Sequence, residues 1–187
     1  SHLLQVSDNP VLLDSDKAEV FHRMVMQLLY LCQRGRPDLR TAISFLCRRT
    51  TAPDEDDYKK LKRVMQYLQA DIDLKLVLSA DGSGVVQWWV DAAYGVHFDM
   101  KSHTGGTLSM GKGSVYSFSG AQKLVSRSST EAELIGVDDL MPQMMWTGYF
   151  LKAQGVAVVD TVLYQDNKSA MLLEKNGRAS SGKHTRH

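Results

Sequence analysis

The chain has 187 residues, of which 43% are hydrophobic and 23% are charged. These values are typical of a globular protein that buries a core. The formal net charge is +1, so no broad positive field indicates a nucleic-acid partner. The N-terminus lacks the layout of a signal peptide, and no apolar run approaches membrane-spanning length. Cys32 and Cys47 are too few for a disulfide framework. We therefore expect a soluble intracellular protein, cytoplasmic or nuclear, with reduced core thiols and no membrane contact.

The first part of the sequence has the periodicity of helices. Residues 1–18 are aperiodic and indicate a linker or tail. After them, apolar residues recur at three- and four-residue steps, which is typical of amphipathic helices. The predicted helices cover about residues 18–34, 38–49 and 54–70. Residues 19–72 are therefore expected to form a small helical bundle.

From residue 74 the pattern changes to short segments rich in β-branched and aromatic residues. The predicted strands are residues 74–78, 85–90, 107–110, 115–118 and 161–164. The first two flank Asp81-Gly82-Ser83-Gly84, which favours a hairpin. Two further helices are expected over residues 128–152, with a kink or break at Pro142, and 167–176, ending at Gly177. This order predicts an α/β domain over residues 73–187.

Three acids lie at special places in this layout. Asp91 follows one apolar strand, Asp166 follows another, and Glu133 lies near the start of the long helix. Because the carboxyl ends of parallel strands share one edge of a sheet, these side chains can converge. Close carboxylates repel one another, so a hard cation such as Mg²⁺ or Mn²⁺ is a natural partner. Taken singly, each aspartate is more often a turn former or helix cap.

Glu131 and Glu133 have different expected roles. Ser128 followed by Glu131 fits a capping box, in which the glutamate folds back to the start of the helix. We therefore expect Glu131 to be structural. Glu133 projects from a different helix face, beside the buried side marked by Leu134 and Val137.

Several other side chains have ordinary structural interpretations. Trp88 and Trp89 alternate within a strand, so one should face the core, and base stacking is the less expected role. His97 and His103 are expected at the surface of a polar loop. Three methionines at helical spacing are expected to fill the core: Met141, Met144 and Met145.

Four segments of the second half resemble one family. They are Val90-Asp91-Ala92-Ala93-Tyr94-Gly95, Lys101-Ser102-His103-Thr104-Gly105-Gly106, Ser128-Ser129-Thr130-Glu131-Ala132-Glu133-Leu134 and Asp166-Asn167-Lys168-Ser169-Ala170. In this order they resemble the ribonuclease H domain of copia-type long-terminal-repeat retrotransposons. Residues 28–31, 36–39 and 61–68 are similar to the helical segment that joins polymerase to nuclease in those polyproteins.

The resemblance implies a ribonuclease H-like mixed sheet with covering helices, preceded by a thumb- or connection-like helical segment. It implies that Asp91, Glu133 and Asp166 are catalytic and bind Mg²⁺ or Mn²⁺. The implied reaction is two-metal hydrolysis of the RNA strand of an RNA–DNA hybrid, and the implied partner is the remainder of a retroelement polyprotein. Many members carry a second acid where this chain has Ala93. Members also continue beyond the equivalent of residue 187 with a fourth acidic ligand, so we expect a domain that lacks its last elements and has reduced activity.

An alternative is a non-catalytic module that only grips nucleic acid. Its candidate phosphate contacts are Lys59, Lys60, Lys62 and Arg63, and separately Lys175, Arg178, Lys183 and Arg186. For the first group a solvated helix face is the more ordinary interpretation, because the acids of residues 54–57 lie beside it.

Overall fold

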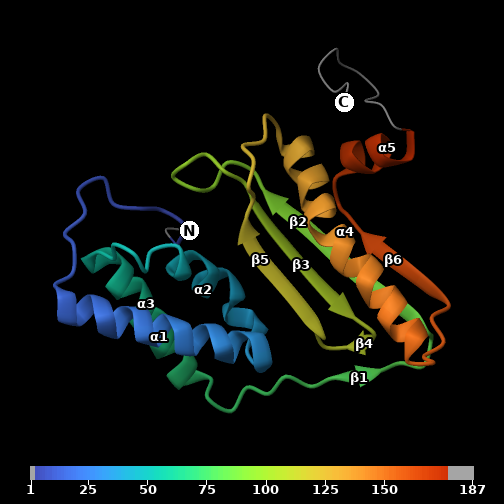
Figure 1. Ribbon diagram of the computed structural model, residues 1–187, viewed down its shortest axis with the longest axis horizontal. Helices are drawn as coiled ribbons and strands as arrows, with labels where there is room; N and C mark the ends of the chain where they lie inside the picture. The colour runs from blue at the N-terminus through green and yellow to red at the C-terminus, as the bar shows by residue number, and fades with distance from the viewer. Residues whose placement is uncertain (1–2, 177–187) are drawn as a thin grey trace. The chain divides into compact units, whose positions relative to one another are not determined.

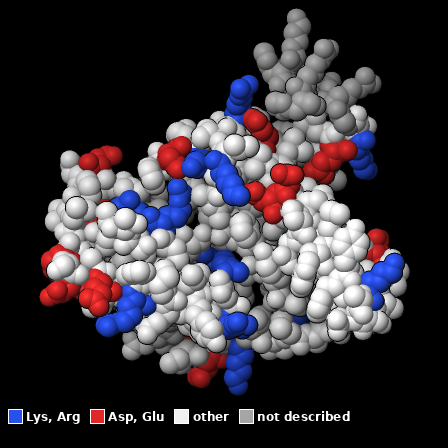
Figure 2. All heavy atoms as spheres, in the orientation of Figure 1, with Lys and Arg blue, Asp and Glu red and all other residues white. Residues whose placement is uncertain are grey.

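The computed structural model describes residues 3–176 and divides into two compact units, Ser1–Val77 and Leu78–His187. Within the described residues, no helix has both the length and the apolar character that crossing a bilayer requires. Charged side chains of both signs are interspersed over the face drawn in Figure 2, in keeping with the near-zero net charge.

The first unit is helical. Its elements are α1 (Ser15–Arg34), a short 3-10 turn (Pro37–Leu39), α2 (Arg40–Cys47) and α3 (Glu55–Ala70). The predicted helices are confirmed, with α1 beginning a few residues earlier than expected because the Asp14 carboxylate accepts the backbone N–H of Lys17. Residues from all these elements share one core: Phe21, Val25, Leu28, Cys32, Leu39, Ile43, Phe45, Leu46, Leu61 and Val64.

Buried acids start α3. The Asp54 carboxylate accepts the backbone N–H of Asp57, and the Asp57 carboxylate accepts the backbone N–H of Asp54 in return. Arg49 forms salt bridges with both carboxylates. Burial raises the pKa of Asp57, and the hydrogen bonds from Asp54 and Arg49 oppose that rise.

Lys60, one of the candidate phosphate contacts, instead contacts other residues of the first unit. The Lys60 ammonium pairs with Asp56 at 2.8 Å and lies 4.7 Å from the centre of the Phe45 ring. Its side chain is only 11% exposed, so the expectation that Lys60 points outward is wrong. Lys59, Lys62 and Arg63 are exposed.

The second unit contains a four-stranded mixed sheet. The strands of the unit are β1 (Ser79–Ala80), β2 (Val85–Ala93), β3 (His103–Ser109), β4 (Gly111–Lys112), β5 (Tyr116–Ala121) and β6 (Asp160–Tyr164). The order in the main sheet is β5-β3-β2-β6. Strands β2, β3 and β5 are antiparallel neighbours, whereas β6 runs parallel to β2. The predicted mixed α/β class is therefore confirmed.

The hairpin expected from the segment at residues 74–78 does not form. That segment is not a strand, and Leu74, Val77 and Leu78 are at least half exposed. The short β1 that follows it pairs with β4 instead of β2. The Asp81 turn itself exists, because the Asp81 carboxylate accepts the backbone N–H of Ser83.

Helix α4 (Ser129–Ala153) packs on one face of the sheet (Figure 1). Alternate residues of β2 face it and are buried: Val86, Trp88, Val90 and Ala92. The helix lies close to the sheet at Gly106, where an added Cβ atom would be 2.2 Å from Leu140 Cδ1. The chain is helical through Pro142, so no break occurs there.

Helix α5 (Lys168–Asn176) follows β6 and begins where expected. The Asn167 side chain accepts the backbone N–H groups of Ser169 and Ala170, which satisfies two free donors at the start of the helix. The predicted stop at Gly177 lies outside the described residues.

Candidate active site

The structure brings the three acids predicted from the sequence to one place. Asp91, Glu133 and Asp166 each offer a carboxylate oxygen, and these oxygens all lie within 4.8 Å of one another. Asp91 and Asp166 are exposed, whereas Glu133 is buried. Within residues 3–176, no lysine or arginine forms a salt bridge with any of the three. The cluster is therefore rich in uncompensated negative charge.

Asp91 lies inside β2 and not after it, which corrects the expected end of that strand at residue 90. Its side chain is on the face opposite α4, because its neighbours Val90 and Ala92 are buried against the helix side. Strand β6 ends at Tyr164, level with Trp89. The residues after Tyr164 therefore no longer pair with β2, and Asp166 approaches Asp91 from this unpaired segment.

Glu133 comes from the second turn of α4 and is 5% exposed. Burial raises the pKa of its carboxyl group above the ordinary value, and the charge of Asp91 adds to that rise. The Gln165 side-chain amide opposes it by donating a hydrogen bond of 3.1 Å to Glu133 Oε2. Gln165 thus fixes one oxygen of the glutamate at the site.

Glu131 has the structural role expected of it. Ser128 Oγ accepts the backbone N–H of Glu131, and the Glu131 carboxylate accepts the backbone N–H of Arg127. The reciprocal bond thus goes one residue further back than in the standard capping box. The start of α4 is fixed by these bonds, which leaves Glu133 to point into the acid cluster.

A buried polar network also holds the start of α4 against the sheet. The Gln122 amide donates to the backbone carbonyl of Ala132, next to Glu133, and to Thr104 Oγ1 on β3. The Thr104 hydroxyl donates in turn to Asp139 on α4. These bonds join β3, the end of β5 and α4, and so they position Glu133 relative to the strand that carries Asp91.

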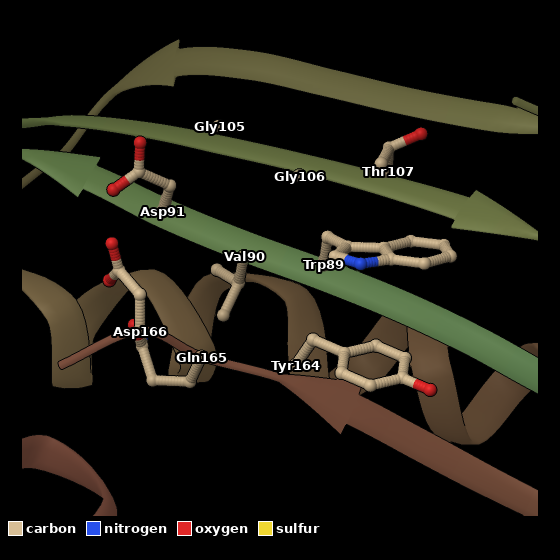
Figure 3. Close-up of a pocket in the computed structure, with 9 residues that line it drawn as sticks. All are labelled: Trp89, Val90, Asp91, Gly105, Gly106, Thr107, Tyr164, Gln165 and Asp166. Carbon is tan, nitrogen blue, oxygen red and sulfur yellow. The ribbon is translucent and has the colours of Figure 1, made fainter. Parts of the chain in front are cut away.

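Two of the acids, Asp91 and Asp166, line one end of a pocket of about 490 Å³ on the face of the sheet opposite α4. The remaining lining comes from three strands and the turn after β6: Trp89, Val90, Gly105, Gly106, Thr107, Tyr164 and Gln165. In Figure 3 the Asp91 and Asp166 carboxylates approach each other at one end, and the Trp89 and Tyr164 rings lie side by side at the other. Gly105 is the register partner of Asp91, and it leaves the space beside that carboxylate open.

Two features of this region were not predicted. His97 and His103 were expected at the surface, but both are buried, with His97 Nε2 and His103 Nδ1 at 2.8 Å. His103 Nε2 also lies 2.6 Å from Ser119 Oγ on β5. Trp89 stacks on Tyr164, with ring centroids 5.1 Å apart. Neither pairing has a local sequence signal, because each depends on how distant strands are aligned.

The comparison with known proteins finds relatives among transposon polyproteins. The chain is 29% identical over 153 residues to the retrovirus-related Pol polyprotein from transposon TNT 1-94 of Nicotiana tabacum, a match that covers 81% of the chain and 11% of that protein. It is 32% identical over 143 residues to the Pol polyprotein from transposon RE2 of Arabidopsis thaliana, covering 75% of the chain and 10% of that protein. The chain is a relative of the Pol polyproteins of copia-type retrotransposons.

This Pol-related chain is also 28% identical over 120 residues to the secreted RxLR effector protein 161 of Plasmopara viticola, covering 64% of the chain and 84% of that protein. It spans about a tenth of the length of the Pol polyproteins it matches. No family model matches the chain, and no solved structure matches it. The relatives therefore support a retrotransposon origin of the sequence.

Proposed function

We propose that this chain is a retroelement ribonuclease H, which hydrolyses the RNA strand of an RNA–DNA hybrid with bound divalent metal ions. The observation that carries the proposal is the convergence of Asp91, Glu133 and Asp166, whose carboxylate oxygens lie within 4.8 Å of one another. In residues 3–176 no lysine or arginine pairs with these acids, and carboxylates this close are costly to hold together unless a cation neutralises them. The relationship to Pol polyproteins supports a reaction on nucleic acid.

The residues present fit Mg²⁺ or Mn²⁺. The donor set consists only of carboxylate oxygens, which are the ligands that these hard cations prefer. Asp91 and Asp166 are exposed at the pocket, so an ion that they held would remain accessible to water and to substrate oxygens. Glu133 is buried and is held by the hydrogen bond from Gln165. Bound metal ions would supply activation of a water molecule and stabilisation of the leaving oxygen of a phosphodiester.

The protein's own contribution is position and access. Strand β2 and the turn after β6 present Asp91 and Asp166 from neighbouring positions, and α4 adds Glu133. Gly105 leaves the space beside Asp91 free for a phosphodiester group. The mixed sheet order β5-β3-β2-β6 with α4 on one face supports a ribonuclease H-like fold. We further propose the remainder of a retroelement polyprotein as partner and the interior of the cell as compartment, where free thiols such as Cys32 persist.

The test is cleavage of an RNA–DNA hybrid labelled on each strand in turn, with and without Mg²⁺. The expected result is metal-dependent cleavage of the RNA strand alone, lowered at least about 100-fold in Asp91→Asn and Asp166→Asn. Glu131→Gln is the matched control, because this carboxylate lies outside the cluster and glutamine keeps a side-chain oxygen that can accept the Arg127 N–H. Clear binding of the hybrid without cleavage, unchanged by Asp91→Asn, would leave only a nucleic-acid grip and contradict the nuclease proposal.

A further inference from the structure

Two stacked aromatic rings lie in the same pocket as the Asp91 and Asp166 carboxylates. Trp89 on β2 and Tyr164 on β6 are register partners, and their rings stack at 5.1 Å with 16° between their planes. They are 38% and 42% exposed. Their neighbours in the strands, Trp88 and Leu163, face the opposite side and belong to the core. The pair therefore faces the pocket and not the interior of the protein.

On each side of the pocket an aromatic ring is followed by an acid, with Trp89 before Asp91 and Tyr164 before Asp166. Asp91 follows Trp89 by two residues, and Asp166 follows Tyr164 by two residues. Because residues i and i+2 of a strand share a face about 6.6–6.8 Å apart, Asp91 lies one step beyond Trp89 on the same face. Figure 3 shows the same order on the β6 side, with Asp166 beyond Tyr164. If a phosphodiester group of a nucleic-acid strand lies at Asp91 and Asp166, the next nucleotide of that strand therefore lies beside the Trp89 and Tyr164 rings.

The rest of the pocket suits such an occupant. Gly105 on β3 pairs with Asp91, and Thr107 pairs with Trp89. These two β3 residues therefore line the pocket beside the acid and beside the ring. A Cβ atom at Gly105 would meet only the Asp91 carbonyl oxygen, at 3.8 Å, so this part of the floor is open. The volume of about 490 Å³ falls within the range of small-molecule pockets.

We infer that Trp89 and Tyr164 form an aromatic platform that positions the nucleotide next to the phosphodiester group held at Asp91, Glu133 and Asp166. The inference rests on the proposed nuclease function, and it adds substrate-positioning residues that the acids alone do not provide. In a base-paired hybrid the base faces are stacked within the duplex, so the rings pack against the sugar and backbone of that nucleotide, a contact that tolerates any sequence. Trp89 and Tyr164 are positioning residues, because they hold the substrate and take no part in the bond change.

The test compares Trp89→Leu and Tyr164→Leu with the wild-type chain and with Trp146→Leu. Trp146 is the matched control, since it is also exposed and stacked, on Phe150 of α4, but lies outside the pocket. Dissociation constants for an RNA–DNA hybrid are measured in Ca²⁺, with strand integrity checked on a gel, and KM and kcat are measured in Mg²⁺. Far-UV circular dichroism and a thermal melt establish that each variant is folded. Trp89→Phe is the second variant at this position and keeps an aromatic ring.

The platform predicts about 5- to 100-fold weaker binding for each leucine variant, a rise in KM larger than any fall in kcat, and partial rescue in Trp89→Phe. Trp146→Leu should bind like the wild type. Cleavage by the wild type with unchanged binding in both leucine variants would overturn the platform and leave the nuclease proposal standing. Ring-dependent binding without cleavage would support the platform and contradict the nuclease proposal, and absence of both would overturn the two together.

Discussion

Two adjacent glycines of β3 should respond in opposite ways to the same substitution. Gly106 faces α4, and an added Cβ atom would lie 2.2 Å from Cδ1 of Leu140, which is 1% exposed. Gly105 faces the pocket, where the Cβ atom would meet only a carbonyl oxygen at 3.8 Å. Neither glycine has a positive φ, so alanine is compatible with both backbones. The comparison therefore isolates the contact between α4 and the sheet.

We expect Gly106→Ala to lower the free energy of unfolding by about 1–3 kcal/mol, the usual cost of overpacking a core. Gly105→Ala should be neutral or stabilising by up to about 1 kcal/mol, because glycine in a strand loses more backbone entropy on folding than alanine does. Leu140→Ala alone should cost about 2–5 kcal/mol. In the Gly106→Ala background it should cost less, by a coupling energy of about 0.5–3 kcal/mol, since the new methyl group occupies part of the space.

The assay is urea unfolding followed by tryptophan fluorescence. All three tryptophans of the chain, Trp88, Trp89 and Trp146, belong to the second unit, so the signal reports on that unit alone. Equal stability of the Gly105→Ala and Gly106→Ala variants, or a coupling energy of zero, would refute the close approach of α4 to β3. The position of Glu133 over the sheet depends on that approach, so the same result would weaken the account of the site.

Two further predictions concern other contacts. Asp38→Asn should destabilise the helical unit by about 1–3 kcal/mol at pH 7, because it weakens the paired hydrogen bonds of the buried Arg36 guanidinium. Arg36 lowers the pKa of Asp38, so this stability is present above about pH 3.9, the ordinary value, and is lost as the pH falls through the lower folded value. Urea unfolding followed by circular dichroism at several pH values measures this change. Lys17→Met is the control: it removes an exposed ion pair, and its free energy of unfolding should lie within about 0.5 kcal/mol of the wild type. Gln165→Leu should weaken Mn²⁺ binding about 10- to 100-fold in a calorimetric titration, because Glu133 loses the donor that fixes Oε2; unchanged affinity would contradict that role.

The helices and the three acids of the candidate site were accessible from the sequence because their signals are local. The capping pattern at Ser128 and Glu131 fixed the start of α4, and Glu133 could be separated from Glu131 on that basis. The strand that precedes Asp166 was also found from its own composition. The convergence of the three acids was an expectation from strand ends, and the distances between them required the structure.

The errors concern features that depend on distant partners. The segment at residues 74–78 has a strand-like composition, but no neighbouring strand pairs with it in the described structure. His103 is buried because it contacts His97 of the preceding loop and Ser119 on β5. The spacing of residues in the sequence does not indicate these contacts. Among the methionines, Met144 is buried as expected, whereas Met141 and Met145 are 40% and 52% exposed, so their placement in the core was wrong. Helical spacing alone did not show which residues of α4 the sheet covers.

The most direct measurement is a crystal structure of the chain soaked in Mn²⁺, with the metal located by its anomalous scattering. We expect Mn²⁺ bound by carboxylate oxygens of Asp91, Glu133 and Asp166, and lost in crystals of Asp91→Asn. Absence of metal at this cluster under saturating Mn²⁺, or carboxylates separated too widely to share an ion, would contradict the proposed metal site.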